Sequence, residues 1–511
     1  MISIKSFKNP FVLHPFLFGL FTTIFLFSHN IGLVKFQDLF SPISVIIITV
    51  IILLVIINLI LKNKNKSALI VSLGLILFFS YGFIYEIIDS SFESNLKHKY
   101  IIAVFVIVFL ISTFYLIKTH RILDNATKIT NAIGVVIILI SLSNIVVYSI
   151  EGDSFTNDFS TDNQIITTDN KVNLPDVYYI ILDAYAGTES LENEFNFDNS
   201  KFYDFLTEKG FYVTKKSHSN YPSTHQSIAS SLNMEYIDQI YSSGSLQKRM
   251  DNAYEIIDNN KVMKNFKSNG YTIININSGW GPSREISNAD INLCTNYRGV
   301  SDSELFSMIV NKSMLNPVYV KIFEEDRREL LLCHFSTLSE VNKMTDDPIF
   351  VFSHITTPHA PYIFGPNGEK VTPKSLELGY EVKDKEGYIG QLQYTNKLVE
   401  DTIEEILTKY DIPPIIIIQG DHGSGETESE LSWQDHDDDA LKERFSILNA
   451  FLVPENEDEI FYETITPVNT FRILFNHIFN DKYDLLEDRL YVAESEFPWN
   501  FIEKTELILQ N

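Results

Sequence analysis

The chain has 511 residues, which is too long for one compact core, so we expect two or more domains. Its formal net charge of −26 argues against nucleic acid as a partner, because phosphate binding needs clustered Lys and Arg side chains. Hydrophobic residues make up 45% of the sequence, and the long apolar runs lie within residues 1–150.

Residues 1–150 are predicted to form a transmembrane region of five helices. Under a five-span count, every Lys- and Arg-rich loop falls on the same side of the membrane. The positive-inside rule then predicts a cytoplasmic N-terminus and an extracytoplasmic chain after the fifth helix. Each apolar stretch approaches or exceeds the roughly 20 residues that cross a bilayer as a helix, and the stretches are Phe11–Phe27, Ser41–Leu61, Ala68–Ile88, Tyr100–Ile117 and Ile129–Ile150.

Residues 151–173 are predicted to be a linker, because they are rich in Ser, Thr, Asn and Asp. Residues 174–511 then alternate between strand and helix patterns, which predicts a doubly wound α/β domain with a mostly parallel sheet. The expected strands are Val177–Leu182, Phe211–Val213, Tyr271–Ile276, Phe350–Ser353, Ile415–Ile418, Ile447–Val453 and Leu490–Val492. The expected helices are Asn199–Lys209, Asn252–Phe266, Glu386–Tyr410 and Val468–Phe479.

Two of these strands end in side chains that bind metals. Asp183 follows Val177–Leu182, and Asp421-His422-Gly423 follows the run that begins at Ile415. Ligands of open α/β sheets gather beyond the carboxyl ends of the strands. Adjacent carboxylate and imidazole groups suit a cation such as Zn²⁺. If the two strands are parallel neighbours, Asp183, Asp421 and His422 meet at one edge, which is our candidate active site.

A third motif, residues 219–233, reads as a loop that enters a helix near Thr224. A hydroxyl at that position has two interpretations. It either caps the helix, as Ser and Thr often do, or it is a nucleophile beside the anion-binding helix N-terminus, activated by a metal. The two strand-end motifs favour the nucleophile. We prefer Thr224 to its neighbour Ser223.

These motifs resemble the alkaline phosphatase superfamily in its sulfatase-like branch, and the membrane layout is similar to that of phosphoethanolamine transferases and lipoteichoic acid synthases. The resemblance covers roughly residues 175–453 and implies that Asp183, Asp421, His422 and Thr224 bind one metal, with Thr224 as nucleophile. The transferases often carry Glu where this chain has Asp183. The Cys/Ser-x-Pro-x-Arg motif that sulfatases oxidise does not match here, which disfavours sulfate ester hydrolysis.

Three further histidines are candidate site residues. His359, in a His-x-Pro sequence after a strand, resembles a superfamily residue that faces the transferred group, and we expect it either to contact the phosphate or to donate a proton to the leaving oxygen. His354 is either a second substrate contact or a strand-end residue. His436 is either a substrate contact or part of an exposed acidic loop. A third alternative pairs His436 with Asp437 around a second metal roughly 4 Å from the first.

Cys294 and Cys333 are the two cysteines of the chain. A disulfide and two buried thiols are equally compatible with the sequence if this part of the chain lies outside the cytoplasm.

Together, these motifs and the membrane layout predict an enzyme of the cell envelope, a multi-pass protein of a bacterial-type cytoplasmic membrane. It would use one divalent metal, Zn²⁺ or alternatively Mn²⁺, to transfer or hydrolyse a phospho-substituent. The expected donor is a membrane lipid, and the acceptor is a surface glycan or a lipid. The alternatives are a phosphodiesterase, phosphatase or sulfatase-like hydrolase of the same superfamily, and a non-catalytic surface receptor.

Overall fold

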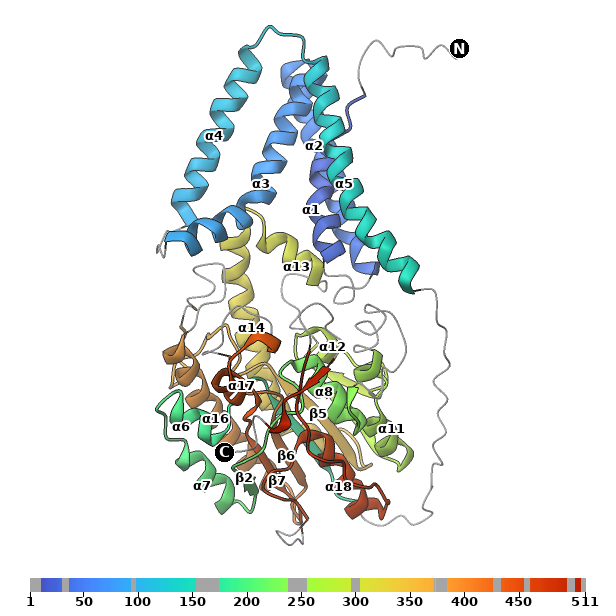
Figure 1. Ribbon diagram of the computed structural model, residues 1–511, viewed down its shortest axis with the longest axis vertical. Coiled ribbons are helices and arrows are strands. Elements are labelled where there is room, and N and C mark those ends of the chain that lie inside the picture. The colour runs from blue at the N-terminus through green and yellow to red at the C-terminus, as the bar shows by residue number, and fades with distance from the viewer. Residues whose placement is uncertain are drawn as a thin grey trace. The chain divides into compact units, whose positions relative to one another are not determined.

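The computed structural model describes residues 11–29, 36–92, 98–152, 174–237, 255–295, 304–371, 373, 384–425, 433–454, 460–493 and 501–506. Their contacts form two compact units (Figure 1). Unit 1 holds the N-terminal helices together with residues 304–323, and unit 2 holds the α/β domain. Most of the predicted linker lies at 153–173, outside the described residues. The predicted fold class, apolar N-terminal helices followed by a doubly wound α/β domain, is confirmed.

The N-terminal part of unit 1 consists of α1 (His14–His29), η1 (Phe36–Leu39), α2 (Phe40–Leu61), α3 (Lys64–Phe92), α4 (His98–Lys118) and α5 (Asp124–Gly152). Helix α1 packs against α2, α3 and α5. Within the described chain, the four helices α2 to α5 are long and apolar enough to cross a membrane by length and composition. Helix α1 has 16 residues, fewer than the roughly 20 that a span needs. The number of spans and the side of the N-terminus therefore stay predictions.

Residues 304–323 add a wall to unit 1 that the sequence analysis did not foresee. They contain α13 (Glu304–Asn311) and the first turns of α14 (Asn316–Leu338). The loop between the two helices makes two backbone hydrogen bonds with α3. Gly82 N donates to Lys312 O at 3.0 Å, and Met314 N donates to Phe78 O at 3.0 Å. A side chain at Gly82 would put its Cβ 2.6 Å from Lys312 Cα, so this close approach requires glycine.

Unit 2 is built on a seven-stranded sheet in the order β2-β7-β6-β1-β5-β3-β4. Its central strand β1 is parallel to both neighbours, β5 and β6, and only β7 pairs in the antiparallel sense with its neighbours, as expected for a mostly parallel sheet. The strands are β1 (Val177–Leu182), β2 (Tyr212–Thr214), β3 (Thr272–Ile276), β4 (Ile291–Leu293), β5 (Ile349–Ile355), β6 (Ile415–Gly420) and β7 (Asn449–Leu452).

Helices cover both faces of this sheet, which explains the uninterrupted apolar run of β1. Tyr179 and Ile181 face a core shared with α8 (Thr224–Asn233), α11 (Lys261–Ser268) and α18 (Pro467–Phe479). Tyr178 and Ile180 face the opposite core, shared with α7 (Ser200–Glu208), α14 and α16 (Lys385–Leu407). All six residues of β1 are buried, so alternation between polar and apolar residues is absent. The short elements of the unit are α6 (Thr188–Asn193), α12 (Gly281–Arg284), η2 (Val341–Lys343), η3 (Trp433–Asp435) and α17 (Asp438–Phe445).

Two predicted elements differ from the structure. The single helix expected over Asn252–Phe266 is wrong, because Asn260 caps a new helix there: its side chain accepts a hydrogen bond from Met263 N and starts α11. The strand expected at Leu490–Val492 exists as β8 (Tyr491–Ala493), but it pairs with β9 (Phe501–Glu503) in a separate two-stranded sheet. Strand β4, at the edge of the large sheet, was not predicted.

Cys294, at the end of β4, forms a disulfide with Cys333 on α14. The bridge joins residues 39 positions apart and ties the edge of the sheet to a helix that covers it.

Replacing both cysteines by serine is expected to lower the free energy of unfolding by about 2–4 kcal/mol, because the bridge restricts the unfolded chain. All three tryptophans of the chain lie beyond residue 174, so their fluorescence during urea denaturation of the full chain in detergent reports on unit 2. Reduction of the wild type should reproduce the shift of the midpoint. Equal midpoints for the variant and the oxidised wild type would contradict this prediction.

Candidate metal centre and active site

The register of the central strands brings two carboxylates to one edge of the sheet. Leu182 of β1 lies opposite Gly420 of β6, so the residues that follow, Asp183 and Asp421, leave the sheet side by side. On the other flank Leu182 lies opposite Ile355 of β5. Asp183 is 5% exposed, and Asp421 is fully buried. Two acids that are 238 residues apart in the chain are thus held together by strand pairing alone.

Asp183, Asp421 and His422 form one group of potential metal ligands, with one atom of each lying within 4.8 Å of the others. His422 Nε2 is 3.3 Å from Asp421 Oδ2 and 3.6 Å from Asp183 Oδ1. Within the described part of the chain, this is the one group of three or more His, Cys, Asp or Glu residues that is close enough to hold a metal ion.

Thr224 brings a hydroxyl to the same point. It is the first residue of α8, and the cap position before it belongs to Ser223, which has extended backbone and makes no side-chain cap bond. Thr224 Oγ1 instead lies 3.0 Å from His422 Nε2. The hydroxyl of Thr224 therefore faces the acidic group and does not cap the helix. The sequence alternative of a cap at Thr224 does not describe this structure.

A strained turn after β1 orients the two acids. Ala184 has φ +61°, a left-handed conformation that residues with a side chain rarely adopt. In this conformation Ala184 N donates to Asp421 Oδ1 at 3.0 Å. Tyr388 of α16 secures the turn, because its hydroxyl donates to Ala184 O at 2.9 Å and accepts from Ala186 N at 3.1 Å. One oxygen of Asp421 is thereby fixed, and the other faces His422.

The charges of the group are strongly coupled. Burial, together with the adjacent Asp183 carboxylate, raises the pKa of Asp421 to about 6. Burial also opposes ionisation of Asp183, but the neighbouring imidazoles of His359 and His354 outweigh it and hold the pKa of Asp183 below its usual value. Burial and the Arg444 guanidinium lower the pKa of His422 well below its usual value, so His422 is neutral. A neutral imidazole and a carboxylate are the forms that bind metals.

These residues fit a divalent cation. Asp183 Oδ1 and Asp421 Oδ2 are buried and have no hydrogen-bond partner among the described residues, a costly state that a cation relieves. His422 Nδ1 lies 2.8 Å from Gly423 O, a pure acceptor, so Nδ1 carries the proton and Nε2 keeps its lone pair. Such a bond from the second nitrogen is typical of metal-binding histidines. Two carboxylates, one imidazole and one hydroxyl suit Zn²⁺.

His354, the sixth residue of β5, and His359, in the loop after that strand, both lie near this group. His354 Nε2 lies 3.5 Å from Asp183 Oδ2, and its Nδ1 is 2.8 Å from Ser283 Oγ. The His359 ring centroid lies 6.2 Å from that of His422, and His359 Nδ1 is bonded to Ala360 O at 2.7 Å, which leaves Nε2 available to a substrate. His354 is fully buried and His359 half-buried, so His359 is the more accessible of the two.

Two arginines near the site were not singled out in the sequence. Arg444 Nε donates to Pro222 O at 2.7 Å, and its Nη2 is 3.3 Å from His422 Nε2, so it links the Thr224 loop to the Asp421-His422 loop. Arg327 Nη2 donates to Thr356 O at 3.0 Å and to Ala360 O at 3.2 Å, on either side of His359. Both lie in strongly charged helices, where an arginine is usually solvated, and no sequence signal distinguishes them.

His436 is connected to the site through Trp433 and Arg444. Its ring packs on Trp433 with centroids 4.9 Å apart, and Trp433 in turn lies under the Arg444 guanidinium, 4.6 Å from the ring centroid. Asp437 caps α17 by accepting from Ala440 N. A substrate contact by His436 stays a prediction.

No protein-family model and no curated protein sequence matches this chain. Among solved structures, the C-terminal periplasmic domain of EptC from Escherichia coli in complex with Zn is similar with a TM-score of 0.44 and 13% identity, over 66% of this chain and 94% of that chain. The integral membrane protein lipooligosaccharide phosphoethanolamine transferase A (EptA) from Neisseria meningitidis is similar with a TM-score of 0.41 and 11% identity, over 91% of this chain and 95% of that chain. Phosphoethanolamine transferases are one of the classes that the sequence motifs resemble.

We expect Asp421→Asn to weaken Zn²⁺ binding by at least about tenfold, because it removes a charged ligand atom from a buried group. Equilibrium dialysis of the full chain in detergent, followed by metal analysis, measures the stoichiometry and affinity. Asp204→Asn, at an exposed acid of α7, is the matched control and should bind like the wild type. Unchanged Zn²⁺ affinity in Asp421→Asn would contradict the ligand assignment.

Besides Pro222 O, Arg444 also donates to Gly423 O, from Nη1 at 3.4 Å. Arg444→Met should lower the turnover rate by about 10- to 100-fold, because these two loop carbonyls lose their common donor and the loops lose their alignment. Steady-state kinetics at saturating metal tests this, and Arg444→Lys should recover only part of the rate, since it cannot span both carbonyls. An Arg444→Met variant with the wild-type rate would show that the link is dispensable.

Proposed function

We propose that the protein is a metal-dependent enzyme that moves a phospho-substituent through a covalent intermediate on Thr224. The observation that supports this most strongly is the Thr224 hydroxyl, 3.0 Å from His422 Nε2 and beside two buried carboxylates. It also stands at the start of a ten-residue helix, whose unpaired backbone N–H groups favour anionic oxygens. A nucleophile, a cation site and an anion site thus coincide.

Asp183, Asp421, His422 and Thr224 would hold the metal, with Zn²⁺ as the first choice and Mn²⁺ as the alternative. When bound, it supplies Lewis-acid stabilisation and lowers the pKa of the Thr224 hydroxyl, whose proton is released to solvent. The Ala184 turn and the Gly423 carbonyl keep Asp421 and His422 in the orientation that this requires.

In the first half-reaction Thr224 Oγ1 attacks the phosphorus of a phosphodiester, and the bond from phosphorus to the lipid alcohol breaks. His359 donates the proton that the departing oxygen needs, from the Nε2 that faces the site. Unpaired backbone N–H groups of the first turn of α8 donate hydrogen bonds to the remaining oxygens and stabilise their negative charge. This step has two products. One is Thr224 with the phosphorylated head group attached to its Oγ1, and the other is the free lipid alcohol.

In the second half-reaction an acceptor hydroxyl attacks the same phosphorus, and the bond to Thr224 Oγ1 breaks. His359, now neutral, takes the proton of the acceptor, the Thr224 oxygen regains a proton from solvent, and the site returns to its initial state. We propose a membrane lipid as donor and a surface glycan or lipid as acceptor, at the outer face of a cytoplasmic membrane. The apolar helices α2 to α5 support this assignment, because a donor that resides in the bilayer needs a membrane-bound catalyst.

Hydrolysis is the second candidate, with water as the acceptor in the second half-reaction. The same first half-reaction serves a phosphodiesterase or a phosphatase, so only the fate of the head group separates the two. A non-catalytic receptor would not need a hydroxyl aligned with the cation site. The receptor is therefore the least favoured of the three candidates, after transfer and hydrolysis.

Thr224→Ala should reduce transfer by at least about 10³-fold, because the covalent intermediate cannot form. Full-length protein is incubated with envelope and with phospholipid labelled at the head-group phosphorus, then quenched in acid. Wild type should carry label on Thr224, and Thr224→Ser should retain a measurable rate. Label that reaches the envelope fraction indicates transfer, and label released only to solution indicates hydrolysis. Full turnover by Thr224→Ala would refute the nucleophile.

A further inference from the structure

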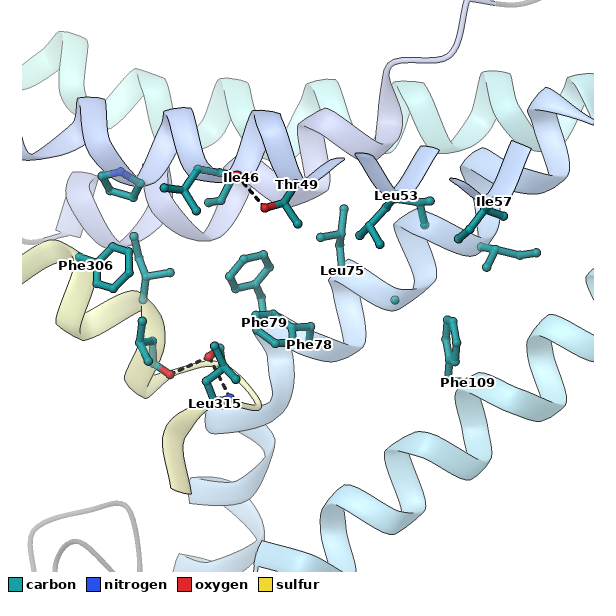
Figure 2. Close-up of a pocket in the computed structure, with 18 residues that line it drawn as sticks. Ile46, Thr49, Leu53, Ile57, Leu75, Phe78, Phe79, Phe109, Phe306 and Leu315 are labelled. Atoms are coloured by element: carbon teal, nitrogen blue, oxygen red, sulfur yellow. Dashed lines mark hydrogen bonds between the residues drawn. The ribbon is translucent and has the colours of Figure 1, made fainter. Parts of the chain in front are cut away.

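Unit 1 contains a cavity of about 460 Å³ between α2, α3 and α4, closed by residues of α13 and the loop after it (Figure 2). The labelled side chains of Figure 2 converge on it from all four helices, among them Leu53, Leu75, Phe79, Phe109 and Phe306. Its size lies within the range of sites for small ligands.

The lining offers nothing to a polar ligand. Only Thr49 and Ser313 carry polar side chains among the residues that surround the cavity. Both hydroxyls already donate within their own segments, Thr49 Oγ1 to Val45 O at 2.8 Å and Ser313 Oγ to Val310 O at 2.7 Å. Water in such a cavity would lack the partners that it needs, whereas apolar molecules occupy cavities of this kind readily. The ligand must therefore be a hydrocarbon.

The wall made by α13 is anchored, so the cavity is a fixed feature of unit 1. The two backbone hydrogen bonds between the α13–α14 loop and α3 hold it, at Gly82 and Phe78. Leu305 is fully buried and Ile309 is 5% exposed, both in one core with α1, α2 and α3. On α3 Gly74 lines the cavity without a side chain, and a Cβ there would come into contact with the Phe109 ring at 3.4 Å.

The surroundings of unit 1 identify the hydrocarbon. Helices α2 and α4, which line the cavity, are long and apolar enough to span a membrane. Their other faces expose large apolar side chains, such as Ile52, Val55 and Ile107, a surface that suits lipid and not water. In a bilayer the most abundant apolar molecules at this surface are the acyl chains of phospholipids.

We propose that this cavity binds one acyl chain of a bilayer phospholipid. Binding requires only unit 1. That the bound lipid is the donor or acceptor of the reaction rests on the proposed function.

The test of binding is photolabelling of the full chain in phospholipid bilayers that contain a phosphatidylcholine with a diazirine in the middle of one acyl chain. We expect label on the peptides that contain Phe79, Phe109 and Phe306. Gly74→Leu, which fills the cavity, should reduce that label by at least about tenfold. Ile52→Leu, at a side chain 52% exposed and outside the cavity, is the matched control and should label like the wild type.

Thr49→Met fills the cavity from α2, whereas Gly74→Leu fills it from α3, so the test does not depend on one variant. Thermal unfolding verifies that each variant folds. Cavity labelling that survives both filling variants, or label confined to outward-facing residues, would overturn the proposal.

Turnover separates this inference from the proposed function. Gly74→Leu should slow the reaction with a long-chain phospholipid by at least about tenfold and leave the reaction with a water-soluble, short-chain analogue unchanged. Thr224→Ala should abolish both reactions and keep the cavity label. A wild type that labels but does not turn over either lipid would contradict the proposed function and uphold the binding site. Equal slowing of both lipids would contradict the catalytic use of the cavity.

Discussion

The candidate site depends on two carboxylates, Asp183 and Asp421, that are buried side by side at one edge of the sheet. The pairing of β1 with β6 holds the two carboxylates close together, and burial prevents water from screening their repulsion. A cation bound between them would relieve this repulsion. The neighbouring groups are arranged for the cation: a neutral imidazole with its lone pair inward, a turn at Ala184 that fixes one oxygen of Asp421, and a hydroxyl at the remaining corner.

The position of Thr224 turns this cation site into a candidate catalytic site. A hydroxyl that capped α8 would be bonded to its own helix, whereas Ser223 occupies the cap position and leaves Thr224 directed at His422. Arg444 joins the loops that carry Thr224 and His422, and Arg327 holds the loop that carries His359. Asp183, Thr224, His359 and the pair Asp421-His422 therefore come from four separate stretches of the chain, and Arg444 and Arg327 join them from α17 and α14. They meet beyond the carboxyl ends of β1, β5 and β6, which is where α/β enzymes gather their ligands.

Sequence reasoning succeeded where local pattern and chemistry agree. The apolar run of Val177–Leu182 ends at an acid, and Ile415–Ile418 leads to another, so parallel pairing was enough to predict their meeting. It failed where tertiary contacts decide. The helix break at Asn260 needs one side chain to bond Met263 N, and the separate pairing of β8 depends on a partner strand ten residues further on. Arg444 and Arg327 each donate hydrogen bonds to two backbone carbonyls, and no sequence spacing encodes such contacts. The association of residues 304–323 with the N-terminal helices likewise depends on backbone contacts at Gly82.

The central claim is that a metal ion sits between Asp183, Asp421, His422 and Thr224. Anomalous diffraction at the zinc edge from crystals of the full chain grown with Zn²⁺ tests it most directly. The account predicts one strong peak about 2.0–2.2 Å from a carboxylate oxygen of each aspartate, His422 Nε2 and Thr224 Oγ1. Absence of a peak at this group from a saturated crystal, or a peak from which the Thr224 hydroxyl is turned away, would contradict it.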